Sequence, residues 1–245
     1  MEENMQTKLI AEFLGTMFLI ILGDGVCCNV NLNKSGMKGA GSIQITFAWG
    51  LAVLLPAYTF GAASGAHFNP AVTIGQCILG NQPWAEFVPY AIAQIAGAFV
   101  GACILYILFK DHFDATEDPG TKLGVFSTGP SIPNVFRNFL SEFVGTFILV
   151  FMLDAISQSG AAGGFNWFLV YSVIVSIGMS LGGLTGYAIN PARDLGPRLA
   201  HAVLPIKGKG DSNFSYGWIP VVGPLCGGIV ASICYMALTN MGVFF

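Results

Sequence analysis

The chain has 245 residues, of which 54% are hydrophobic and only 9% are charged, and its mean hydropathy is +0.68. Soluble domains carry about 25% charged residues, so this composition excludes a soluble globular protein and indicates helices packed within a membrane. The formal net charge of -3, without any basic cluster, argues against nucleic acid as a partner.

Six apolar segments are each long enough to cross the hydrocarbon core, which needs about 20 residues. They cover residues 9–31, 43–62, 85–109, 139–157, 165–184 and 217–241. The first contains Glu12 and has no basic leader region before it, which favours a mature span over a signal peptide. The sequence therefore predicts an all-α membrane protein with six transmembrane helices.

Two further apolar pieces, residues 71–79 and 192–204, are too short or too interrupted to span a bilayer. Such segments are tolerated at membrane depth only where protein encloses them or where they line a wet cavity, so we expect two re-entrant half-helices. A polar connector at 110–137 divides the chain into halves of similar size, about 8–109 and 138–241.

The two halves repeat one another. Ala-Glu-Phe-Leu-Gly-Thr at 11–16 returns as Ser-Glu-Phe-Val-Gly-Thr at 141–146, and an Asn-Pro-Ala box at 69–71 returns at 190–192. Because an odd number of crossings separates equivalent points, the second half enters the membrane from the opposite side. The sequence thus predicts an inverted repeat within a single domain of residues 1–245, whose two short segments meet near the midplane.

Each short segment begins with a box that suits a helix start. Proline fits the first helical position, where its missing N–H would be unpaired anyway, and asparagine is a natural N-cap. Two such N-termini at one point would repel cations and donate hydrogen bonds to a neutral solute, whereas one box alone would more simply cap a buried helix. The paired boxes are Asn69, Pro70, Ala71, Asn190, Pro191 and Ala192.

The paired boxes, the two Glu-Phe-x-Gly-Thr starts and the run Asn-Pro-Ala-Arg-Asp-x-Gly-Pro at 190–197 resemble those of the major intrinsic proteins, the aquaporins. The aspartate after the arginine is similar to that of the aquaglyceroporin branch, the glycerol uptake facilitators. The resemblance covers about residues 8–240. It implies an aquaporin-like right-handed bundle, assembled as a homotetramer in the plasma membrane with cytoplasmic termini. It also implies passive flux of glycerol, water and related uncharged solutes, without a cofactor or metal.

In this family four positions form an aromatic and arginine filter, which the resemblance places at Trp49, Gly178, Tyr187 and Arg193. Water-selective members carry a histidine at the Gly178 position and a small residue at the Tyr187 position. Glycine leaves room that an imidazole would fill, the two aromatic rings offer an apolar wall, and the guanidinium offers donors to hydroxyls. These features favour glycerol, with dihydroxyacetone, urea and lactic acid as further candidate solutes.

Non-helical backbone before each box cannot pair its own C=O groups, so we expect a ladder of carbonyl acceptors along the pore. The residues are Gly65, Ala66, His67, Phe68, Gly186, Tyr187, Ala188 and Ile189. The resemblance implies that the repeat mates Glu12 and Glu142 hold the two loops from behind. Asp194, in the first turn of the second half-helix, is counted with them as loop support. It suits the helix dipole and is expected to orient Arg193 or to pair with a loop lysine.

Asp24 and Asp154 lie at membrane depth, where ionisable side chains are functional suspects. Three interpretations stand: lining of an exposed vestibule, a structural acid bonded to a neighbouring helix, and a proton-linked site. The last would support a coupled secondary transporter, the alternative to a passive channel. An intramembrane enzyme is disfavoured, because His67, His112 and His201 have no partner by spacing for catalysis or metal binding.

Charge and resemblance disagree about orientation. Cytoplasmic termini would place most of the basic residues on the opposite side, against the positive-inside rule. These residues are Lys34, Lys38, Lys110, Lys122, Arg137, Lys207 and Lys209. We keep the orientation that the resemblance implies, because an inverted repeat works either way up.

Overall fold

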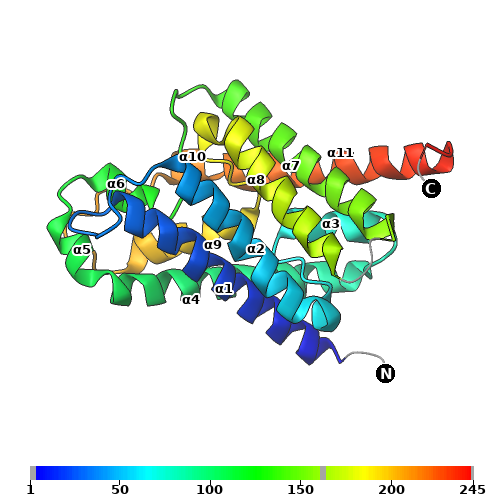
Figure 1. Ribbon diagram of the computed structural model, residues 1–245, viewed down its shortest axis with the longest axis horizontal. Helices are drawn as coiled ribbons and strands as arrows, with labels where there is room; N and C mark the ends of the chain where they lie inside the picture. Colours follow the sequence, from blue (N-terminus) through cyan, green and yellow to red (C-terminus); the bar gives the residue numbers. More distant parts are fainter. Residues whose placement is uncertain (1–3, 161–163, 244–245) are drawn as a thin grey trace.

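The computed structural model describes residues 4–160 and 164–243, and every regular element in these two ranges is a helix (Figure 1). Six of the described helices are long and apolar enough to cross a membrane. They are α1 (Met5–Asn31), α2 (Ser42–Ser64), α4 (Trp84–Leu108), α7 (Val135–Gln158), α8 (Phe165–Thr185) and α11 (Ile219–Asn240), the last preceded by the short α10 (Phe214–Gly217). The prediction of a multi-pass, all-α membrane protein is confirmed.

Two helices are about half the length of the others, α3 (Pro70–Ile78) with 9 residues and α9 (Pro191–Val203) with 13. Each begins at the proline of an Asn-Pro-Ala box, one residue earlier than the predicted apolar piece. The long helices before them, α2 and α8, both end at a glycine in the left-handed conformation, with φ of 83° at Gly65 and 84° at Gly186. Glycine adopts this conformation without strain, so it ends the long helix and turns the chain inward.

The connector predicted at 110–137 contains two short helices, α5 (Lys110–Ala115) and α6 (Pro119–Gly124). Asp118 caps α6 by accepting a hydrogen bond of 2.7 Å from the backbone N–H of Thr121. Both short helices lie at one end of the bundle, whereas α1 begins and α11 ends toward the opposite end (Figure 1). This arrangement fits six crossings, because an even number returns the chain to the side from which it entered.

Both halves have the same element order: two long helices, a half-length helix and another long helix. In the first half α1 packs against α2 and α4, and in the second α7 packs against α8 and α11. The half-helices also cross between halves, since α3 contacts α11 and α9 contacts α4. The two halves therefore interlock around the half-helices.

Small residues allow the long helices to approach closely. A Cβ atom added at Gly97 of α4 would lie 2.1 Å from the carbonyl oxygen of Phe13 on α1. At the equivalent position of the second half, a Cβ at Gly227 of α11 would lie 2.3 Å from the carbonyl oxygen of Phe143 on α7. The same backbone contact therefore occurs in both halves.

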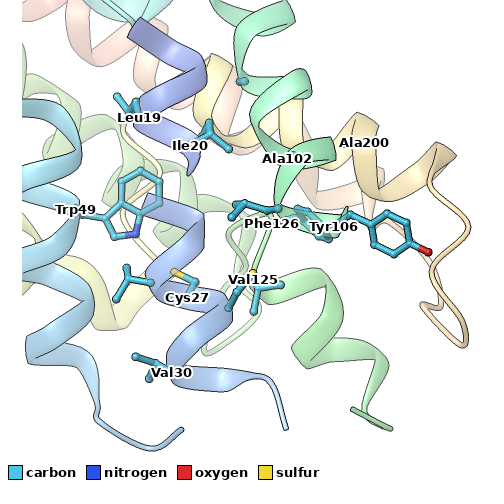
Figure 2. Close-up of a cluster of buried hydrophobic side chains, with 14 of the residues drawn as sticks. Leu19, Ile20, Cys27, Val30, Trp49, Ala102, Tyr106, Val125, Phe126 and Ala200 are labelled. Atoms are coloured by element: carbon cyan, nitrogen blue, oxygen red, sulfur yellow. The ribbon is translucent and has the colours of Figure 1, made fainter. Parts of the chain in front are cut away.

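The outer faces of the long helices carry exposed apolar side chains. They include Phe47, Ile92, Ile107, Phe168 and Ile233. Water would solvate such a surface poorly, whereas hydrocarbon chains match it. On the inner side, the Trp49 ring of α2 packs against α1, as Figure 2 shows.

Candidate functional site

The asparagine of each box caps its own half-helix. Asn69 accepts a hydrogen bond of 2.9 Å from the backbone N–H of Ala71 through its side-chain oxygen. Asn190 accepts in the same way from the N–H groups of Ala192 and Arg193, at 3.0 and 3.2 Å. These bonds fix both side-chain oxygens toward the helix, so that the amide nitrogens point away from it.

The two amide nitrogens reach across to the opposite loop. Asn69 Nδ2 donates to the carbonyl oxygen of Ile189 at 2.8 Å, and Asn190 Nδ2 donates to that of Phe68, also at 2.8 Å. The N-termini of α3 and α9 therefore meet at one point, as the sequence predicts. An amide nitrogen carries two N–H bonds. Both asparagines also line a cavity of about 450 Å³, so each has a second donor for a molecule inside it.

The loops before the half-helices hold an unusual backbone. Four non-glycine residues have positive φ, at 53° for Ala66, 48° for Phe68, 38° for Tyr187 and 42° for Ile189. Each such residue costs about 1–3 kcal/mol, and the conformation persists only where surrounding contacts enforce it.

Glu12 of α1 supplies those contacts for the first loop. Its carboxylate is fully buried and accepts hydrogen bonds from the backbone N–H groups of His67 and Phe68, at 2.9 and 2.7 Å. Ser64 and Gln94 donate to the same carboxylate. In a trans peptide the C=O points opposite to the N–H, so the carbonyls of Ala66 and His67 face away from Glu12.

Glu142 of α7 does the same for the second loop. It accepts from the N–H groups of Ala188 and Ile189, at 3.1 and 2.8 Å, and from the hydroxyl of Thr185 at 2.7 Å. The carbonyls of Tyr187 and Ala188 consequently face away from the glutamate. The carbonyls of Phe68 and Ile189 differ from this pattern, because they accept the asparagine amides described above.

In the two Glu-Phe-x-Gly-Thr motifs, the contacts of the glycine and the threonine explain why these residue types occur there. The ring of Phe68 lies over Gly15, where a Cβ would stand 2.0 Å from it, and Ile189 lies over Gly145 in the same way, at 2.9 Å. The threonine hydroxyl of each motif donates to the carbonyl oxygen of its own glutamate, at 2.7 Å. The motif therefore holds the loop backbone through glutamate and makes room for a loop side chain at glycine.

Arg193, in the first turn of α9, is fixed from three directions. Its Nη1 donates to the carbonyl oxygen of Phe126 at 3.0 Å, and its Nη2 forms an ion pair with Asp24 Oδ1 at 3.1 Å. Its Cζ lies 4.2 Å from the centre of the Trp49 ring, within the range of a cation–π contact. The structure thus brings together two of the four predicted filter residues in direct contact.

Tyr187 and Gly178, the other two, also touch. A Cβ at Gly178 would lie 2.9 Å from Tyr187 Cζ and 2.6 Å from the methyl group of Thr46. A Cβ at Gly182, one turn further along α8, would lie 2.7 Å from the same ring. The open room expected beside Gly178 is therefore occupied: the tyrosine ring lies flat on the surface that two glycines provide.

The cavity of about 450 Å³ connects these parts. At the end of the bundle where α1 starts, Lys8, Asn81 and Gln82 line it. Further in, the lining includes both loops and both asparagines, and at the other end it includes Trp49, Tyr187 and Arg193.

Asp194 does not have the partner expected for it. It accepts two hydrogen bonds from Arg198, at 2.7 and 3.0 Å, and two from Thr128, both at 2.8 Å. The prediction that it orients Arg193 or pairs with a loop lysine is wrong, because the i,i+4 spacing on α9 puts Arg198 beside it. The sequence interpretation overlooked this fully buried arginine, although that spacing could have revealed it.

Asp24 and Asp154 are both buried, with 0% and 1% of their surface exposed, so the interpretation as vestibule lining is wrong. Asp154 accepts hydrogen bonds from Gln76 of α3 at 2.8 Å and from Ser232 of α11 at 3.1 Å. It is a structural acid bonded to neighbouring helices. Asp24 instead meets Arg193, and no finding favours the coupled transporter.

Taken together, six long helices surround a cavity entered by two half-helices, which defines a polytopic membrane protein of the channel type. The model of the major intrinsic protein family matches residues 2–235, and the chain belongs to this family. The resemblance inferred from the paired boxes is confirmed.

Curated relatives and a solved structure agree with this membership. The chain is 54% identical over 231 residues to the glycerol uptake facilitator protein of Bacillus subtilis (strain 168), which covers 94% of this chain and 84% of the relative. It is 49% identical over 238 residues to glycerol uptake facilitator protein 3 of Lactiplantibacillus plantarum, covering 97% and 99%. The X-ray structure of the aquaglyceroporin from Plasmodium falciparum superposes with a TM-score of 0.84 at 30% identity, covering 95% of this chain and 96% of that one.

Proposed function

We propose that this chain is a passive channel through which glycerol, water and related small uncharged solutes cross the membrane, while protons and ions are excluded. It acts as a channel and not as an enzyme, in keeping with its family. One observation carries the proposal: a single cavity is lined by both box asparagines, by the two strained loops and by Trp49, Tyr187 and Arg193. The names of the relatives point to glycerol as the solute.

In this proposal the hydroxyl groups of a polyol contact polar groups of the pore, while its carbon backbone contacts apolar ones. Its hydroxyl groups would donate to the loop carbonyls and accept from Arg193 and the asparagine amides, replacing the hydrogen bonds that it leaves behind in water. Its carbon backbone would lie against the rings of Trp49 and Tyr187. Cations would be repelled by the guanidinium and by the two helix N-termini, which carry partial positive charge.

We also propose the finer features that the sequence suggested. They are one channel domain of residues 1–245 with inverted repeats at 8–109 and 138–241, a homotetramer in the bilayer of the plasma membrane, and cytoplasmic termini. The matching contacts of Gly97 and Gly227 and the exposed apolar surface support the repeat and the lipid contact. The terminal residues 1–3 and 244–245 lie outside the described residues.

Swelling of proteoliposomes containing the purified protein tests this function. We expect glycerol to enter many times faster than into protein-free liposomes, and we propose dihydroxyacetone, urea and uncharged lactic acid as further solutes to be ranked in parallel. A sorbitol gradient serves as the control for leakage, because a six-carbon polyol is larger than glycerol. Glycerol entry no faster than in empty liposomes would contradict the proposal.

A further inference from the structure

Asp24 of α1 is a buried charge with a single partner. Its side chain is fully buried, and neither carboxylate oxygen accepts a hydrogen bond from the described residues. Among those residues, the ion pair with Arg193 Nη2, at 3.1 Å, is its one polar contact. The other buried acids differ: Glu12 accepts four hydrogen bonds, and Asp154 is satisfied by Gln76 and Ser232. An isolated buried carboxylate is costly, so a role tied to its one partner is the natural explanation.

Asp24 stands behind the filter and not in the cavity. Trp49 and Arg193 belong to the cavity lining, whereas Asp24 lies beyond them on α1. The residue before it, Gly23, supports the Trp49 ring, because a Cβ there would lie 2.4 Å from that ring. One turn of α1 therefore sets the positions of two filter side chains: it provides a flat surface for the tryptophan and an anion for the arginine.

The ion pair fixes the direction of the guanidinium. Phe126 holds Nη1 through its carbonyl oxygen, Asp24 holds Nη2, and the plane of the group lies near the Trp49 ring. With both ends held, the guanidinium stays beside the tryptophan. If the Asp24 contact is lost, Nη2 has no other polar partner among the described residues, and because Arg193 already lines the cavity, the freed end of the guanidinium can turn into it.

We propose that Asp24 is a positioning residue that determines specificity: by holding Arg193 against Trp49 it keeps the filter wide enough for a polyol. This inference rests on the proposed channel function and names a residue that acts on solute only through Arg193. An arginine released from Asp24 extends toward the cavity and obstructs glycerol more than water, because water is the smaller molecule. The effect is therefore on the ratio of the two permeabilities.

The test compares glycerol and water permeability in the same proteoliposomes. Asp24→Ala removes the acceptor, and Asp24→Val removes it while filling most of the volume, which serves if the alanine variant folds poorly. We expect both to lower the glycerol-to-water ratio about tenfold, because both remove the anion that holds Arg193 beside Trp49. Asp24→Asn keeps the shape and an oxygen beside Nη2 but removes the charge of the ion pair, so we expect its ratio to fall less than that of Asp24→Ala.

Asp154→Ala is the matched control, since Asp154 is the repeat mate of Asp24 and equally buried but bonded away from the filter. We expect it to leave the ratio unchanged, even if it lowers the amount of folded protein. An unchanged ratio in Asp24→Ala or Asp24→Val overturns the inference, and so does the same loss in Asp24→Asn or Asp154→Ala. Failure of the unmodified protein to conduct glycerol contradicts the channel function itself, a separate outcome.

Discussion

The double variant Gly178→His with Tyr187→Cys is expected to conduct glycerol about tenfold or more slowly, while its water permeability stays within about twofold. In the structure the tyrosine ring covers Gly178, so cysteine removes the ring and histidine takes its space from the side of α8, with a small shift of the Thr46 methyl group, which lies 2.6 Å from a Cβ at this position. The imidazole offers a hydrogen-bonding group where an apolar ring stood. Glycerol loses the wall that matches its carbon backbone, whereas water needs only donors and acceptors.

Parallel osmotic swelling in glycerol and in an impermeant solute measures this change. Gly178→His alone is a less clean test, because a Cβ at this position already lies 2.9 Å from the tyrosine ring. Gly183→His is a better control, since a Cβ at this exposed position of α8 meets no atom of the described residues within 4 Å. A double variant with the glycerol-to-water ratio of the unmodified protein would remove both residues from the proposed filter.

Glu142→Gln should lower glycerol and water permeability together, by about tenfold or more. Gln has nearly the same shape as Glu, but one acceptor oxygen becomes an NH₂ donor. Because the carboxylate accepts from the N–H groups of Ala188 and Ile189 and from the hydroxyl of Thr185, a donor would face a backbone donor. The strained loop then loses a contact that enforces it, and its carbonyls no longer hold their direction.

Thermal unfolding in detergent accompanies the permeability measurement, since the same change leaves a buried N–H unpaired and costs about 1–3 kcal/mol of stability. Glu117→Gln is the matched control, because Glu117 is an exposed acid of the connector. If the Glu142→Gln variant conducts glycerol and water as fast as the unmodified protein, Glu142 does not support the loop.

Much of the fold follows from local features of the sequence. The six crossings follow from segment length and apolar composition, and the half-helices follow from short apolar pieces that begin with Asn-Pro. Helix caps depend only on near neighbours, so the bonds from Asn69 and Asn190 to their own helices could be anticipated. The internal repeat further predicted that the two Asn-Pro-Ala boxes meet, which could not be inferred from either segment alone.

Partners between distant elements could not be predicted in this way. Spacing alone suggested Asp194 for Arg193, but the arginine side chain extends away from its own helix and meets Asp24 of α1. Likewise the ring of Tyr187 covers Gly178 because the loop turns back on α8, a direction set by tertiary contacts. A long side chain can reach several helices, and tertiary packing determines which of them it contacts. A sequence pattern therefore does not predict that partner.

The passive character of the channel is tested most directly by glycerol uptake into proteoliposomes under an imposed proton gradient. We predict that labelled glycerol equilibrates across the membrane and stops at equal concentrations. The initial rate should be the same with the gradient in either direction or collapsed by an ionophore, because no buried acid exchanges protons with the cavity in the proposed mechanism. Accumulation of glycerol above its external concentration, abolished by the ionophore, would contradict a passive channel and restore the coupled transporter.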